Sequence, residues 1–294
     1  MIRIITDSSS NLNLELAQKY NIEIMPLSIS FGKEEFLDGV NISHEEFYRR
    51  LKTSDTLPKT SQINPVTFEN KFSEYLALGD EIIGIFISSE LSGTFQSANI
   101  AKLNLSSDKI HLIDSRTVSS AISLLCIEAA RLRDNDKTAE EIVALIEEML
   151  PHVKIYAAVT SLEYLKKGGR LNSIEALCGN LLKINPVVTT EDGKVAVAGK
   201  FRSNASLINF FKDKLKQLQI QNNTDFFYLD IENKEKLDIL KENCKDYVNR
   251  ETKEHHSSTI GAAVGTHVGP GAFGFAFIEQ YESAILSAHI EKSA

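Results

Sequence analysis

The residues best suited to chemistry form a loop of small hydroxylated side chains at positions 88–94. The loop reads SSELSGT and follows an apolar run at residues 82–87. Such a run predicts a buried strand, and the residues after the loop predict a helix. In an open α/β sheet, ligands bind in loops at the carboxyl ends of strands. Backbone N–H groups, hydroxyls and the N-terminus of the following helix therefore predict a site for an anionic group, with Ser92 and Gly93 in it.

Three further segments carry polar side chains that suit an anion. Thr60 and Ser61 precede a predicted helix, and they either bond the local backbone or donate to a ligand carboxylate. Arg170 ends a compact basic turn, which is either a solvated helix end or a group that reaches an anion. His267 lies in a glycine-rich segment, where a predicted loop setting favours function over simple packing. The sequence alone leaves these alternatives open.

Catalysis by this chain alone is a weaker interpretation. Ser92, His267 and either Asp7 or Asp114 would be the triad of an acyl hydrolase. No G-x-S-x-G nucleophile elbow occurs in the sequence, so this reading remains an alternative. The run GPGAFG at residues 269–274 formally matches a dinucleotide fingerprint, but a predicted strand follows it instead of a helix. We expect no nucleotide cofactor and, without ligand spacing among the histidines and cysteines, no metal.

Composition limits the classes of partner. The chain has 294 residues and a net charge of −8, and its acidic excess argues against nucleic acid. The three cysteines, Cys126, Cys178 and Cys244, lie in helix-like segments and are expected to be small buried thiols. The first residues predict a strand and not a signal peptide, and no apolar run approaches the length of a spanning helix. We therefore expect a cytoplasmic protein.

The elements that must position these residues alternate between strands and helices in the first half. Strands are expected at residues 2–6, 22–31, 82–87 and 110–114, with helices between them, which predicts crossover connections and a mainly parallel sheet. Asn11 is expected to cap a helix over residues 12–20, Asn64-Pro65 marks another helix start, and Thr138 with Glu141 marks a third. Pro151 ends the last of these helices. We place a domain boundary there, with an N-terminal α/β domain at 1–151 and a second domain at 152–294.

The second half predicts a mixed α/β domain. Residues 185–190 and 194–201 flank Glu191-Asp192-Gly193, which is a hairpin signal. Further strands are expected at 226–230, 258–264 and 272–278, and helices at 204–219 and 233–248. The fold class is therefore α/β, with a parallel sheet in the first domain and a mixed sheet in the second.

Taken together, these segments resemble the DegV family of bacterial proteins. The matching motifs occur in family order and span nearly the whole chain, so the set is specific although each motif alone is weak. They are Thr6-Asp7-Ser8, Thr60-Ser61-Gln62, the SSELSGT loop at 88–94, Ile113-Asp114-Ser115, the SLEYLKKGGR run at 161–170 and the HVGPGA run at 267–272.

The resemblance implies more than the residues show by themselves. Family members are two-domain α/β proteins that hold one long-chain fatty acid in a tunnel between the domains. In many bacteria they are the acyl-binding subunit of fatty acid kinase, in which a separate ATP-dependent subunit phosphorylates the bound carboxylate for phospholipid synthesis. Such a chain is not itself an enzyme, uses no cofactor, and contacts the membrane surface only transiently. A carrier of another anionic lipid, without a kinase, is the remaining alternative.

The resemblance also implies roles for particular residues. Thr60 and Ser92 match positions that hydrogen-bond the carboxylate, with Ser61 and Gly93 beside them. His267 and Arg170 match positions near the head group, and the roles that we infer for them are charge compensation and orientation. Arg202 matches a basic position associated with docking of the kinase or the membrane. The lining of the tail tunnel is not assigned from the sequence.

Overall fold

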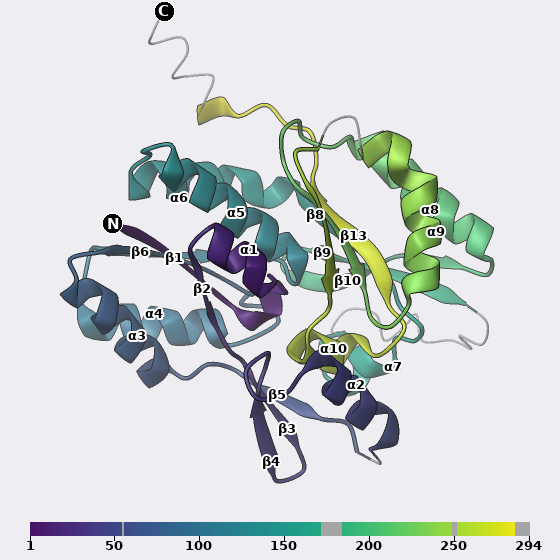
Figure 1. Cartoon of the computed structure of the whole chain (residues 1–294), viewed down its shortest axis with the longest axis horizontal. Helices are drawn as coiled ribbons and strands as arrows, with labels where there is room; N and C mark the ends of the chain where they lie inside the picture. Colours follow the sequence, from purple (N-terminus) through teal and green to yellow (C-terminus); the bar gives the residue numbers. More distant parts are fainter. Residues whose placement is uncertain (55, 172–183, 249–251, 286–294) are drawn as a thin grey trace, which may run out of the picture.

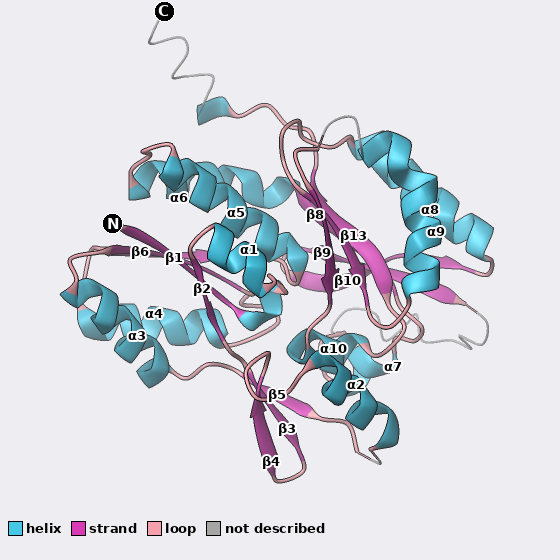
Figure 2. Cartoon of the chain, viewed as in Figure 1, coloured by secondary structure: helices cyan, strands magenta, loops and turns pink. Residues whose placement is uncertain are grey.

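The computed structural model describes residues 1–54, 56–171, 184–248 and 252–285 (Figure 1). Figure 2 shows helices and strands alternating along the chain, as expected for an α/β protein. Two large sheets and one small one organise the molecule, and the α/β class with a parallel and a mixed sheet is confirmed.

The first sheet is parallel and has the strand order β2-β1-β6-β7. Alternate residues of its strands are buried on opposite faces: Ile4 packs with the cluster that includes α5 and α6, and Ile5 with the cluster that includes α3 and α4. Because both faces are covered, the strands read as nearly continuous apolar runs. The elements are β1 (Ile2–Asp7), β2 (Ile22–Met25), β6 (Glu81–Phe86), β7 (Ile110–Asp114), α3 (Pro65–Ala77), α4 (Thr94–Leu105), α5 (Ser120–Asp134) and α6 (Ala139–Met149).

A small antiparallel sheet lies beside the first and was not predicted as a unit. Its order is β4-β3-β5, with β3 at Ser28–Phe31, β4 at Glu34–Leu37 and β5 at Lys59–Ser61. Helix α2 (His44–Thr53) connects β4 to β5. The pairing of Thr60 with Ile29 holds the Thr60–Ser61 segment in an extended conformation, which directs it toward the site described below.

The second sheet is mixed and has the strand order β10-β9-β8-β13-β11-β12. Helices α8 and α9 pack through an aromatic-rich cluster on one face, and α5 contacts β8, β11 and β13 on the other. The elements are β8 (Val153–Ala158), β9 (Asn185–Glu191), β10 (Lys194–Phe201), β11 (Phe226–Asp230), β12 (His255–Thr259), β13 (Phe273–Ile278), α7 (Glu163–Lys167), α8 (Asn204–Leu218), α9 (Lys234–Val248) and α10 (Ala262–Val268).

Helix α5 joins the two halves of the molecule. It contacts both large sheets, and one hydrophobic cluster includes residues from both halves. At its end, Arg131 Nη2 donates to Asp225 Oδ1 at 2.6 Å, and His256 Nε2 lies 2.8 Å from Asp225 Oδ2. Burial acts to raise the pKa of Asp225, but the bonds to His256 and Arg131 hold it below its ordinary value. The domain boundary at residue 151 stays a prediction. The second sheet starts just after it, at Val153, but α5 and one hydrophobic cluster extend across both halves.

Several local predictions are confirmed by the structure. Asn64 caps α3 with Pro65 at its first position, and Thr138 forms a capping box with Glu141 at the start of α6. The hairpin predicted around residues 191–193 is β9–β10. Cys126 and Cys244 are buried, and burial raises the pKa of each thiol to about 12. Cys178 lies outside the described residues.

Two local predictions are wrong. The strand expected at 258–264 ends at Thr259, and α10 begins at Ala262, because the carboxylate of Asp38 accepts hydrogen bonds from the backbone N–H groups of Ala262 and Ala263. The helix expected at 12–20 is α1 (Leu14–Lys19), with Asn13 as its N-cap. Asn11 instead ends a 3-10 turn in the left-handed conformation.

Candidate functional site

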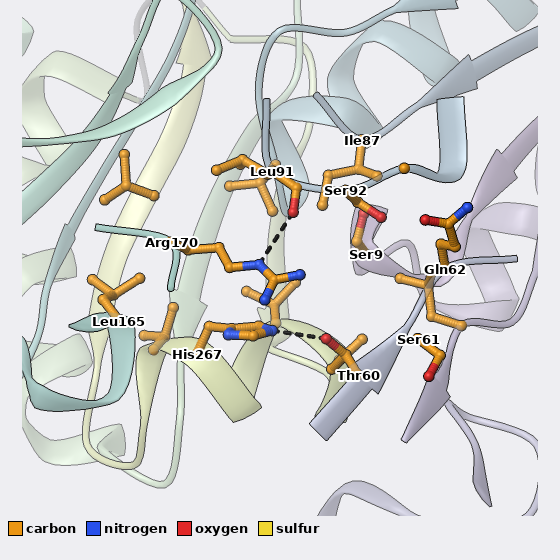
Figure 3. A pocket seen from close by; sticks show the side chains of 17 residues that line it. Ser9, Thr60, Ser61, Gln62, Ile87, Leu91, Ser92, Leu165, Arg170 and His267 are labelled. Atoms are coloured by element: carbon orange, nitrogen blue, oxygen red, sulfur yellow. Dashed lines mark hydrogen bonds between the residues drawn. The ribbon is translucent and has the colours of Figure 1, made fainter. Parts of the chain in front are cut away.

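A cavity of about 340 Å³ lies where the two halves meet, and all six residues expected to bind the ligand line it. Figure 3 shows Arg170 and His267 side by side on one wall, with Thr60 and Ser92 opposite. The six are Thr60, Ser61, Ser92, Gly93, Arg170 and His267. Arg202 is exposed between β10 and α8 and does not line the cavity.

The SSELSGT loop follows β6, as predicted, and the buried carboxylate of Asp7 holds its start in place. Asp7, at the end of β1, accepts hydrogen bonds from the backbone N–H of Ile87 and from both the N–H and the hydroxyl of Ser9. Ile87 and Ser9 both line the cavity. Burial raises the pKa of Asp7 although these bonds act to lower it. One side chain thus joins the loops that leave two neighbouring strands.

Ser92 is half-buried at the head of α4. Its Oγ accepts a hydrogen bond from the backbone N–H of Thr94 at 3.3 Å and lies 2.9 Å from the Thr94 hydroxyl. Gly93 is the N-cap of α4 and has no side-chain hydrogen bond to the helix. Gly93 lines the cavity, so the N-terminal end of this helix lies at the cavity wall, which suits an anion.

Arg170 follows α7 and extends across to the first half. Its Nε donates to the carbonyl of Leu91 at 3.2 Å, and its Nη1 donates to the carbonyl of Gly168. No carboxylate of the described residues forms an ion pair with it. Burial lowers the pKa of the guanidinium from its ordinary value. A partly buried cation without a counter-ion is unfavourable, so the site is electrostatically suited to a negative ligand.

His267 lies on α10 and not in a loop, which corrects the sequence prediction. Its Nε2 lies 2.8 Å from the hydroxyl oxygen of Thr60, and its buried Nδ1 finds no hydrogen-bond partner among the described residues. Burial, with the nearby charge of Arg170, lowers the pKa of the ring to about 4. With that pKa the ring of His267 is neutral near pH 7, so Arg170 is the positively charged member of the pair.

The tautomer of His267 decides what Thr60 can do. A buried N–H without an acceptor is less favourable than a bare ring nitrogen, so we assign the proton to Nε2. Nε2–H then donates to Thr60 Oγ1, and the hydroxyl hydrogen of Thr60 is left to donate into the cavity. The ring is held close to α7, since a Cβ added to Gly168 would lie 2.2 Å from Nδ1.

A second cavity, of about 50 Å³ and almost wholly apolar, continues from the first. The two share Val118, Leu165, Val195, Val264 and Val268. The second is lined by side chains of the mixed sheet and of the segment after β12, among which Leu229 and Ile260 are buried. At the other end, Ser61 and Gln62 are exposed. The combined space thus has a polar mouth near the surface and an apolar interior.

A family model described as an uncharacterised protein of the DegV family matches residues 1–280. The chain belongs to the DegV family. A DegV domain-containing protein of Clostridium perfringens is 36% identical over 280 residues, covering 95% of this chain and 99% of the relative.

Solved DegV structures share this fold. A Thermus thermophilus member, described for its fatty acid binding, matches with a TM-score of 0.88 over 95% of this chain and 99% of its own, at 24% identity. At that identity the likeness shows the fold alone. A Thermotoga maritima protein, described as revealing a fatty acid binding function, matches with a TM-score of 0.83 at 26% identity, over 95% and 99% of the two chains.

The triad of a hydrolase is not assembled in this DegV chain. The hydroxyl of Ser92 bonds Thr94, and His267 Nε2 bonds Thr60. The carboxylate of Asp7 accepts hydrogen bonds from the backbone N–H groups of Ser9 and Ile87 and has none with His267. Asp114 accepts hydrogen bonds from Ser89 and the backbone of Arg116. The mechanism requires a hydrogen bond between the nucleophile and the base. Within the described ranges, Ser92 and His267 share none.

Sequence reasoning missed part of the lining. Gln62 belongs to the Thr60-Ser61-Gln62 motif and Ser9 follows the Thr6-Asp7-Ser8 motif, but neither was assigned to the site because nothing in its type distinguished it. The valines and leucines of the apolar end are ordinary core residues by composition. Across the parts of the chain that the structure describes, no cluster of three or more His, Cys, Asp or Glu could hold a metal ion, and no helix is long and apolar enough to cross a membrane.

Proposed function

We propose that the chain binds one long-chain fatty acid, with its carboxylate at the polar mouth and its tail in the apolar interior. The observation that carries this proposal is Arg170, a partly buried cation that no carboxylate of the described residues pairs with, beside a cavity that has a polar mouth and an apolar interior. The fatty acid binding described for the Thermotoga maritima relative supports the same ligand class.

The site offers distinct groups to the two carboxylate oxygens. Thr60, oriented by His267, donates from one wall, and Ser92 with the N–H groups at the start of α4 donates from the other. Hydrogen bonds and a nearby cation favour the ionised form of a carboxylic acid. The tail supplies most of the affinity, since each buried CH₂ contributes about 0.8 kcal/mol.

Mass spectrometry of an organic extract of the purified protein tests this proposal. We expect one long-chain fatty acid for each protein molecule, and stoichiometric uptake of added fatty acid after delipidation. Arg170→Gln should bind the acid more weakly but a fatty alcohol of the same length almost unchanged. A protein that is empty and takes up no fatty acid would overturn the proposal.

We further infer that the bound carboxylate is presented to a separate ATP-dependent kinase subunit. The exposed Ser61 and Gln62 at the polar mouth support this, because a partner can approach the head group there while the tail stays buried. An ionised carboxylate held in place is the nucleophile that phosphoryl transfer requires, and positioning is the main contribution to such a step. Arg202, exposed after β10, is proposed as a docking residue for this partner.

Phosphorylation can be followed with the kinase subunit of the same organism, ATP and hydroxylamine, which traps an acyl phosphate as a hydroxamate. Hydroxamate should form only when the loaded protein and the kinase are both present. Arg202→Glu should lower its rate without changing fatty acid affinity. Fatty acid binding without any hydroxamate would favour a carrier of anionic lipids that has no kinase.

A further inference from the structure

The tip of the β9–β10 hairpin is attached to its own sheet by few contacts. Strand β9 pairs with β8 only through Val187 and Val188, while its pairing with β10 continues to Glu191 and Lys194. Strand β8 has four more residues in that direction, Val153–Tyr156, but β9 does not pair with them, so within the described structure residues 189–197 form a two-stranded finger that separates from the sheet. An isolated two-stranded hairpin is marginally stable in water, so the position of the finger depends on what holds its tip.

Three side chains of the first half hold that tip. Ser88 Oγ donates to the carbonyl of Gly193 at 2.7 Å, and Arg116 Nη2 donates to the carbonyl of Asp192 at 2.6 Å. The hydroxyls of Thr117 and Thr190 lie 3.0 Å apart. We call Ser88, Arg116 and Thr117 the latch.

The fit at the tip is close. Gly193 has a φ of +80°, and a Cβ there would lie 2.5 Å from Ser88 Oγ. An ion pair between Lys194 and Glu90, at 3.4 Å and partly exposed, adds little. The tip itself is held mainly by these hydrogen bonds. Val195 and Val197 of the finger also pack against the hydrophobic cluster that spans both halves, so opening must separate these apolar contacts as well.

The inner face of the finger is a wall of the apolar cavity. Val188, Thr190 and Val195 line it, and Val195 also lines the polar cavity. Thr190 and Val195 are paired across the two strands, so their side chains lie on the same face. The other described walls come from β8, β11, α7, α10 and the segments at Val118–Ser119 and Ile260; β8 and β11 are paired on both edges, and α10 is packed against α2 and α7. Outward movement of the finger would remove this wall of the apolar cavity.

We propose that residues 189–197 are a door over the tail cavity, held shut by the latch, and that the ligand enters and leaves when the latch opens (Figure 1). This inference rests on the proposed binding of a fatty acid. Because Ser88 belongs to the same loop as Ser92, the latch couples the closure of the tail cavity to the loop that receives the carboxylate.

A reversible cross-link tests the door directly. In Thr117→Cys with Thr190→Cys, the two sulfurs replace hydroxyl oxygens that are 3.0 Å apart, and a disulfide can form with a small adjustment. The dissociation rate of bound cis-parinaric acid, an intrinsically fluorescent fatty acid, should fall at least roughly tenfold on oxidation and recover on reduction. Equal rates in the oxidised and reduced protein would overturn the door.

Opening the latch should have the opposite effect. Arg116→Ala with Thr117→Val removes two of its bonds without altering a cavity-lining side chain. Association and dissociation should both accelerate by roughly tenfold, with the Kd changed less than twofold, and the amides of residues 189–197 should exchange faster with deuterium. Thr117→Ser, which keeps the hydroxyl, is the matched control.

The outcomes separate the two proposals. Unchanged rates and unchanged amide exchange in the double variant would overturn the latch even if the fatty acid binds normally. If the unmodified protein takes up no parinaric acid, the proposed function and the door both fail. The latch is then decided by amide exchange alone, which needs no ligand: faster exchange of residues 189–197 supports it, and unchanged exchange overturns it.

Discussion

The hydroxyl of Thr60 is expected to be the donor that His267 prepares for the carboxylate. Thr60→Val keeps the shape of the side chain and removes only the hydroxyl. The variant loses a hydrogen bond to the ligand. The Nε2–H of His267, which lies 2.8 Å from Thr60 Oγ1 in the parent protein, also loses its acceptor. The fold should be maintained, because Thr60 is held in β5 by backbone pairing with β3.

The magnitude follows from the charge of the ligand. A hydrogen bond to a charged group contributes about 1.5–3 kcal/mol, so the Kd for a fatty acid should rise roughly 10- to 150-fold. The tail is unaffected, and each of its buried CH₂ groups still contributes about 0.8 kcal/mol. Thr60→Val should therefore still bind fatty acid. For a fatty alcohol of equal length, the Kd of the variant should differ far less from the Kd of the parent protein.

Titration of delipidated protein with fatty acid and with the matching alcohol measures both effects. Thr60→Ser, which keeps a hydroxyl, should bind nearly as the parent does. If His267 acts through Thr60, the effects of His267→Leu and Thr60→Val should be far from additive in a double-mutant cycle. An unchanged Kd in Thr60→Val, or full additivity of the two changes, would refute the reasoning.

Three further predictions concern the supports of the site. Gly168→Ala should weaken fatty acid binding roughly tenfold in the same titration, because the new Cβ would lie 2.2 Å from His267 Nδ1 and displace the ring. The folded state holds the pKa of His267 near 4, below its ordinary 6.5, so on acidification the unfolded chain binds the proton first. The free energy of unfolding should therefore fall by about 3 kcal/mol as the pH drops from 6.5 to 4. Urea unfolding at several pH values should show that the free energy of unfolding depends less on pH in His267→Leu than in the parent protein. An equal dependence on pH would contradict this prediction. Asp225→Asn should lower the free energy of unfolding by about 3 kcal/mol, because it removes the fully buried carboxylate that Arg131 and His256 share and leaves Arg131 with Glu128 alone among the described residues. An unchanged urea midpoint would argue against that role.

The sequence predicted the elements whose signals are local. The hydroxyl-rich loop after β6, the proline-led start of α3 and the hairpin at 191–193 all depend on residues within a few positions of one another. The same holds for the alternation of strands and helices, which indicates the parallel first sheet. The six expected ligand-binding residues were assigned through the resemblance to the DegV family, since their types and spacing alone left the alternatives open.

What the sequence could not show depends on contacts between distant segments. The seven residues of α10 are too few for a helical period, and the helix exists because Asp38 caps it and because Gly265 packs against Tyr48. The bond from Arg170 to the carbonyl of Leu91 joins residues 79 positions apart. The apolar cavity is lined by valines and leucines of several elements, and no local pattern marks them as cavity residues.

A crystal structure with a fatty acid that carries bromine on its terminal carbon would test the central claim most directly. The anomalous signal should place the bromine in the apolar cavity, near Leu229 and Ile260, with the carboxylate between Thr60 and Ser92 and close to Arg170. A bromine at the polar mouth, or a ligand bound elsewhere on the molecule, would contradict the proposed assignment of head group and tail.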